Sequence, residues 1–137
     1  MINLEQYLSV PYVEGGRTLD GLDCWGLVLL VRESMGLGPL PSIGGAVASQ
    51  PLAVDRAHTS ASSHLDVCSP EPGAVAAVFK GKLFVHAGVV VEIDGRLAVI
   101  ETNPKVPPRI LWLADFERTY FKVVYYRDRD LRRKTRR

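Results

Sequence analysis

One cysteine in this sequence stands where a thiol is most readily ionised. Cys24 follows Asp23 in "LDGLDCWGLVLLVRESMG", and from Cys24 onward apolar residues recur at the spacing of a helix that Gly36 would close. The start of a helix carries partial positive charge and unpaired N–H groups, both of which favour thiolate over thiol. Asp23 can cap this helix. We therefore expect Cys24 to be a nucleophile.

A nucleophilic cysteine needs a base, and the three histidines differ as candidates. His58 and His64 lie in a segment rich in Gly, Ala and Ser, where a solvated loop histidine is expected. His86 opens the predicted strand "HAGVVVEI", and its small neighbours Ala87 and Gly88 leave space for a partner or substrate to approach. A histidine buried for purely structural reasons is the plain alternative. Pairing with Cys24 makes His86 the expected base.

The third candidate element is "IETN" at residues 100–103. Strand residues two positions apart face the same side, so Glu101 and Asn103 would project together. If the hairpin "VEIDGRLA" returns the chain antiparallel to the His86 strand, both side chains would lie near the imidazole. Glu101 could then accept the second ring N–H, and Asn103 could donate toward an oxyanion or orient the ring instead. Polar residues on an exposed strand face are also common without any function.

Composition predicts one globular domain over residues 1–126 and a basic tail over 127–137. The chain has 137 residues, of which 47% are hydrophobic, and a net charge of +2, yet residues 127–137 hold seven of its 17 Lys and Arg. A solvated tail is the expected interpretation, with a docking segment for an acidic partner or nucleic acid as the alternative. We expect no nucleic-acid-binding domain. Neither a secretory signal nor an apolar run of about 18 residues is found, which predicts a soluble chain without a membrane span.

Helix-like patterns come first and strand-like patterns second. A short helix is expected over residues 3–9 and a long one from Cys24, followed by an irregular segment over 37–63 with one short helix near 49–57. Residues 73–103 alternate in the manner of antiparallel strands with turns at "KGK" and "IDGR", and 119–128 would add a strand. This order predicts an α+β fold in which the helix packs on one face of an antiparallel sheet.

The two cysteines, Cys24 and Cys68, form no CxxC pair and no cluster with histidine. A zinc site and a disulfide framework are therefore not expected, and a redox role lacks a resolving cysteine near Cys24. Cys68 is expected to be a buried or partly buried structural thiol.

Three stretches resemble the NlpC-type cell-wall peptidases. "VPYVEGGRTLDGLDCWGLV" is similar to their cysteine motif, "EPGAVAAVF" to their PGDLVFF strand, and "HAGVVVEIDGRLAVIE" to their histidine strand, over about residues 5–103. The resemblance implies a papain-like α+β core without a cofactor, with Cys24 as nucleophile and His86 as general base. It also implies that Tyr12 shapes the substrate or oxyanion site and that Asp23 binds the free amine of a peptidoglycan stem peptide.

The sequence departs from that family in two places. Many members carry a polar third residue about a dozen positions after the histidine, where this chain reads "LAVI". The "ExN" ending instead resembles the cysteine, histidine-dependent amidohydrolase/peptidase group, which makes Glu101 the first choice as orienter of His86 and Asn103 the second. The acid of PGDLV is also missing, because Ala74 follows Gly73.

"DCWGLV" is similar to the phage tail-tip and tail-assembly branch, related to the lambda tail protein K. That likeness implies a tail-associated peptidase made in the host cytoplasm, carried in the virion tail and acting in the periplasm or cell wall. Its partners would be the stem peptide and other tail-tip or baseplate proteins. The alternative is a structural tail or assembly protein that keeps the fold with an inactive site.

Overall fold

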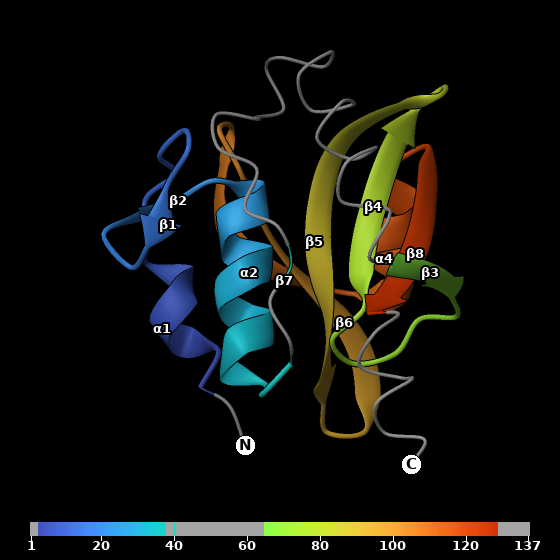
Figure 1. Ribbon diagram of the computed structural model, residues 1–137, viewed down its shortest axis with the longest axis horizontal. Coiled ribbons are helices and arrows are strands. Elements are labelled where there is room, and N and C mark those ends of the chain that lie inside the picture. Colours follow the sequence, from blue (N-terminus) through green and yellow to red (C-terminus); the bar gives the residue numbers. More distant parts are fainter. Residues whose placement is uncertain (1–2, 38–39, 41–64, 129–137) are drawn as a thin grey trace.

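The computed structural model describes residues 3–37, 40 and 65–128. Within them the chain forms three helices and eight strands, which Figure 1 colours from blue to red along the sequence. In chain order they are α1 (Glu5–Leu8), β1 (Arg17–Thr18), β2 (Gly21–Leu22), α2 (Cys24–Ser34), β3 (Leu65–Cys68), β4 (Val75–Lys80), β5 (Leu83–Ile93), β6 (Arg96–Asn103), β7 (Val106–Trp112), α4 (Leu113–Thr119) and β8 (Lys122–Asp128). The helix expected near 49–57, His58, His64 and residues 129–137 of the expected tail lie outside the described residues.

Six strands form one antiparallel sheet in the order β3-β8-β4-β5-β6-β7, while β1 and β2 pair separately. Helix α2 contacts β5 and β6, and α4 contacts β6 and β7. Figure 1 shows α2 alongside β5, with α4 on the far side of the sheet behind β4. The predicted α+β fold, with a helix packed on an antiparallel sheet, is confirmed. The second helix on the opposite face was not predicted.

Alternate residues of the central strands divide between two apolar clusters. Val89 and Val91 of β5 pack with Leu27 and Val28 of α2, whereas the intervening Val90 packs in the cluster that contains Phe116 of α4. Successive strand residues point to opposite faces, so both faces of the sheet are covered. Burial of apolar surface on both sides holds β5 and β6 firmly between the helices. These are the strands that carry His86 and Glu101.

The predicted turn at "IDGR" is confirmed as a two-residue connection between β5 and β6. Asp94 and Gly95 both have positive φ, 52° and 80°, as a type I′ hairpin turn requires. The turn fixes a register in which Ile93 pairs with Arg96 and Val89 with Ile100. This register carries Glu101 back alongside the His86 end of β5.

Several boundaries differ from the sequence-based prediction. His86 does not open its strand, because β5 begins at Leu83 and includes "LFV" before the histidine. Strand β7 and helix α4 were not predicted, and Thr119 belongs to α4 and not to the last strand. Strand β8 extends to Asp128, two residues into the expected tail. Among the described residues, none of the helices has the length and apolar character needed to cross a membrane.

Candidate active site

Helix α2 begins at the candidate nucleophile because Asp23 caps it. Asp23 Oδ1 accepts hydrogen bonds from the Gly26 N–H and from Arg17 Nη1, both at 2.7 Å, and Oδ2 accepts one from the Gly15 N–H at 3.0 Å. The carboxylate is 0% exposed. Asp23 therefore serves as the predicted N-cap, and both of its oxygens already have protein partners. The amine-binding role implied by the resemblance stays a prediction.

Cys24 is the first residue of α2 and is only 5% exposed. Gly26, two residues further along α2, has no room for a side chain, because a Cβ there would lie 2.1 Å from the carbonyl oxygen of Gly16. The loop before the helix is thus packed directly against the first turn of α2. This packing fixes where the Cys24 thiol lies relative to the sheet.

His86 of β5 lies between Cys24 and Glu101. Its Nε2 is 2.8 Å from Glu101 Oε1, and an ionised carboxylate can only accept, so Nε2 carries the proton in this bond. The hydrogen bond that the sequence predicted between these two residues is present. The other ring nitrogen, Nδ1, is buried and has no hydrogen bond of regular geometry within the described residues.

The thiol of Cys24 nevertheless interacts with the imidazole. Burial acts to lower the pKa of His86, but hydrogen bonding to Cys24 and Glu101, together with their negative charge, raises it to about 9. Because Nε2 is bound to Glu101, Nδ1 is the nitrogen left for the sulfur. The ring is thus placed to take a proton from the thiol on one side while the carboxylate stabilises the resulting imidazolium on the other.

Glu101 is 0% exposed and is the acceptor for three donors. Besides His86, the hydroxyl of Tyr120 donates to Oε1 at 2.5 Å and Arg109 Nε donates to Oε2 at 2.8 Å. Burial pushes the pKa of Glu101 up, but the bonds to His86, Tyr120 and Arg109 hold it below its ordinary value. Glu101 is therefore an ionised, buried partner for the imidazole.

Asn103 does not join the imidazole as the alternation of strand residues predicted. Its Oδ1 accepts from the backbone N–H groups of Lys105 at 2.9 Å and Val106 at 3.2 Å, so the side chain closes the turn between β6 and β7. The register of these strands shifts between Glu101 and Asn103. Such a bulge breaks the rule that residues two apart face the same side.

Tyr12 brings a buried hydroxyl toward Cys24. Its backbone bridges to Leu22, just before α2, and its hydroxyl oxygen has no hydrogen-bond partner within the described residues. Burial, followed by the negative charge of Cys24 and Asp23, raises the pKa of Tyr12 well above its ordinary value. The hydroxyl therefore stays a neutral donor, available to an oxygen that arrives beside the sulfur.

The expectation that Ala87 and Gly88 leave room for a substrate is wrong. Ala87 is fully buried in the apolar cluster under α2. A Cβ on Gly88 would lie 2.7 Å from Val99 Cγ1 and 2.9 Å from the carbonyl oxygen of Ile100. The small residues beside His86 therefore allow β5 and β6 to pack closely.

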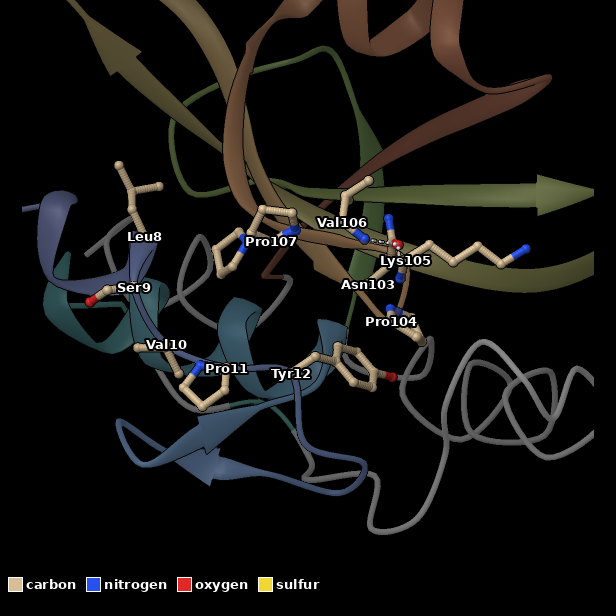
Figure 2. A pocket seen from close by; sticks show the side chains of 11 residues that line it. Leu8, Ser9, Val10, Pro11, Tyr12, Asn103, Pro104, Lys105, Val106 and Pro107 are labelled. Atoms are coloured by element: carbon tan, nitrogen blue, oxygen red, sulfur yellow. Dashed lines mark hydrogen bonds between the residues drawn. The ribbon is translucent and has the colours of Figure 1, made fainter.

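An open groove lies instead between residues 8–12 and the turn after β6. Figure 2 shows Tyr12 and Pro11 on one wall and Pro104, Lys105 and Pro107 on the other. Its volume is about 430 Å³, and Lys105 is the one charged residue that lines it among the described residues. Tyr12, whose pKa is raised in part by the charge of Cys24, is the candidate-site residue that lines the groove.

Cys68 lies in a different part of the fold from Cys24. It lies half-buried on the edge strand β3, and burial raises its pKa to about 11. The expectation of a partly buried thiol is confirmed. Within residues 3–37, 40 and 65–128, no cluster of three or more His, Cys, Asp and Glu side chains could hold a metal ion.

Sequence reasoning missed Arg109 and Tyr120. Arg109 is the direct cross-strand partner of Glu101 in the β6–β7 register, and Tyr120 follows α4. A prediction of β7 from the β-branched and aromatic residues of "VPPRILW" would have pointed to Arg109, although its two prolines argue against a strand. No local signal identifies Tyr120.

No model of a known protein family matches this chain, and comparison with curated proteins likewise gives no match.

Proposed function

We propose that this chain is a cysteine peptidase or amidase of the NlpC type that hydrolyses amide bonds in peptidoglycan stem peptides. The papain-like form of the α+β fold and a place in a phage tail, beside other tail-tip or baseplate proteins, belong to the same proposal. One observation carries it: the His86 ring is held between the Cys24 thiol and the carboxylate of Glu101. Clusters of buried titratable groups with perturbed pKa values are typical of functional sites.

This arrangement suits acyl transfer. The Cys24 thiolate attacks the scissile carbonyl and forms a C–S bond, while His86 gives its Nδ1 proton to the leaving amine as the C–N bond breaks. His86 then takes a proton from water as the water oxygen attacks the thioester carbonyl. The C–S bond breaks, which releases the acid and regenerates the Cys24 thiolate. Glu101 stays ionised throughout. Its carboxylate accepts the Nε2–H of His86 and stabilises the imidazolium.

The negative oxygen of the tetrahedral intermediate would lie at the start of α2. Backbone N–H groups and the positive end of the helix dipole gather there. The hydroxyl of Tyr12, for which the described residues offer no hydrogen-bond partner, adds a donor that would bind the oxyanion when it forms. This preference for the transition state over the free enzyme is what accelerates the reaction.

The groove beside Tyr12 supports a peptide as substrate. Its walls are two proline-containing segments, and a fixed backbone on both sides suits an extended chain. Lys105 would attract the carboxylates that stem peptides carry. The identity of the substrate rests on the resemblance of the sequence motifs to the family.

The decisive experiment is incubation of the purified protein with peptidoglycan and with isolated stem peptides. Mass spectrometry should detect new amine ends with the wild-type chain and none with Cys24→Ala. Cys68→Ser is the matched control, because it removes the other thiol and should cleave at the wild-type rate. Full cleavage by Cys24→Ala would contradict the proposed function. A wild-type chain that cleaves nothing while Cys24 remains reactive would favour a structural tail protein.

A further inference from the structure

Two residues that take no part in the proposed chemistry bind the carboxylate that orients His86. Tyr120 donates to Oε1 of Glu101 at 2.5 Å, the same oxygen that receives the His86 Nε2–H, and Arg109 Nε donates to Oε2 at 2.8 Å. The carboxylate lies entirely out of solvent. Each oxygen therefore has a fixed donor besides the imidazole.

A buried carboxylate without such donors would take up a proton. Removal of an ionised carboxylate from water is costly, and burial alone raises the pKa of an acidic group. Protonated Glu101 would carry its own O–H and would no longer be an obligatory acceptor for the His86 Nε2–H. The orientation of the ring, and with it the nitrogen presented to Cys24, would then be free to change.

Arg109 and Tyr120 reach Glu101 from two different elements. Arg109 is opposite Glu101 across the β6–β7 pairing, and Tyr120 directly follows α4. The Tyr120 ring also lies 5.3 Å from the His86 ring and 5.0 Å from Phe116, measured between centroids. Since Phe116 is fully buried, the Tyr120 ring is held between the sheet and α4. Hydrogen bonds from β7 and from the residue after α4 thus restrict rotation of the Glu101 carboxylate.

Other charged groups near this cluster are engaged elsewhere. On α4, the carboxylate of Asp115 pairs with Arg118, and Glu117 accepts from the Tyr125 hydroxyl. Glu101 is therefore faced by His86 from β5, Arg109 from β7 and Tyr120 after α4. Cys24 of α2 lies beyond the imidazole.

We propose that Arg109 and Tyr120 are positioning residues that hold Glu101 ionised and fixed, so that Nδ1 of His86 stays turned toward Cys24. This inference rests on the proposed function in taking Cys24 as the nucleophile. It goes beyond that function, because neither residue touches the reacting atoms and the resemblance assigns neither of them a role.

The test measures alkylation of Cys24 by iodoacetamide between pH 4 and 9, in the full chain carrying Cys68→Ser. Arg109→Met and Tyr120→Phe each remove one donor from Glu101, so Glu101 should protonate at a higher pH. The acid limb of the alkylation profile should move upward by about one pH unit for Arg109→Met, which is about a tenfold slower reaction on that limb. Tyr120→Phe should move it in the same direction. Above pH 8 all rates should agree within about twofold, since Glu101 is ionised in every variant.

Two further variants separate positioning from general damage. Arg109→Lys keeps the positive charge and should recover part of the shift, while Arg96→Met removes an arginine that stacks on Trp112, with 3.8 Å to the ring centroid, and should leave the acid limb unchanged. NMR titration of the Glu101 side-chain carboxyl carbon should show protonation at a higher pH in Arg109→Met than in the wild type. Acid limbs that coincide with that of Arg96→Met would overturn the inference. Failure of the wild type to cleave stem peptides would instead overturn the proposed function and leave the alkylation profile intact.

Discussion

The imidazole of His86 and the carboxylate of Glu101 are joined by a 2.8 Å hydrogen bond across the β5–β6 hairpin, with both groups out of solvent. The type I′ turn at Asp94 and Gly95 sets the register that brings them together. Cys24 approaches the same ring from α2, so three elements meet at one side chain.

The raised pKa of His86 predicts a shift of the alkaline limb of hydrolysis to about pH 9. Below that pH the ring keeps the proton that the leaving amine needs, and above it hydrolysis should fall. Alkylation of Cys24 should not fall in the same range, because it needs only the thiolate. The same shift stabilises the fold fully below the ordinary histidine pKa of about 6.5, and this stabilisation is lost as pH rises through 9. A decline of hydrolysis already near pH 7 would contradict the assignment.

Replacement of Glu101 by Gln should lower kcat by about 100-fold. The amide removes the negative charge that stabilises the imidazolium, so the pKa of His86 should fall toward its ordinary value and the alkaline limb should move down with it. Rates measured from pH 5 to 10 check both effects. Glu117→Gln, which alters the carboxylate bound to Tyr125, is the matched control and should keep the wild-type profile.

Tyr12→Phe should lower kcat by about 10- to 100-fold with little change in KM, because the hydroxyl bonds only the transition state. The stability of the free protein should stay the same or rise, since the buried oxygen has no partner within the described residues. Tyr7→Phe is the matched control, because the Tyr7 hydroxyl donates to the Leu30 carbonyl at 3.4 Å. This variant should lower the free energy of unfolding slightly and leave kcat unchanged. Equal rates for Tyr12→Phe and wild type would remove Tyr12 from the oxyanion site.

Asp23→Ala should destabilise the fold by about 1 to 2 kcal/mol, the cost of losing an N-cap, as measured by denaturant unfolding. Asp23→Asn should cost less, because its Oδ1 can still accept from the Gly26 N–H. The amine-binding role that the family resemblance implies is tested separately, with the wild type and an N-acetylated substrate. If Asp23 acts only on the fold, N-acetylation of the substrate should change KM little in the wild type. A large rise in KM for the acetylated substrate would restore the recognition role.

Gly88→Ala should destabilise the sheet by about 1 to 3 kcal/mol and slow the reaction. The added methyl would press on Val99 and on the backbone of Ile100, and so push β6, with Glu101, away from β5. Thermal unfolding and the rate of hydrolysis measure the two effects. The double variant Gly88→Ala with Val99→Ala should recover part of the loss, because the side-chain contact is relieved while the backbone contact remains.

The local patterns of the sequence were sufficient to predict the elements that carry the site. The helix from Cys24, its Asp23 cap and the hairpin at "IDGR" follow from helical spacing, a capping residue and turn chemistry, all of which act within a few residues. The contact between His86 and Glu101 followed because a two-residue hairpin leaves little freedom in register. These features depend on interactions between residues close together in the chain, which can be identified from one sequence.

The rest depends on contacts that no local pattern encodes. The bulge after Glu101 redirects Asn103 into a turn, although strict alternation would have placed it beside the imidazole. Gly88 was expected to leave space beside His86, because the sequence does not show which residue packs against a glycine. In the fold Val99 and the backbone of Ile100 occupy that space. Arg109 and Tyr120 meet Glu101 through tertiary packing of β7 and α4, and the prolines of β7 conceal that strand.

The sheet order also bears on how the molecule assembles during synthesis. Within the described residues, β3 pairs only with β8, which itself lies between β3 and β4 and is made about sixty residues later. During synthesis the β4–β5–β6 meander can form, and His86 can bind Glu101, before β8 exists. Until then β3 lacks the strand with which it pairs. His86 and Glu101 are thus synthesised, and can pair, before the strand that completes the sheet.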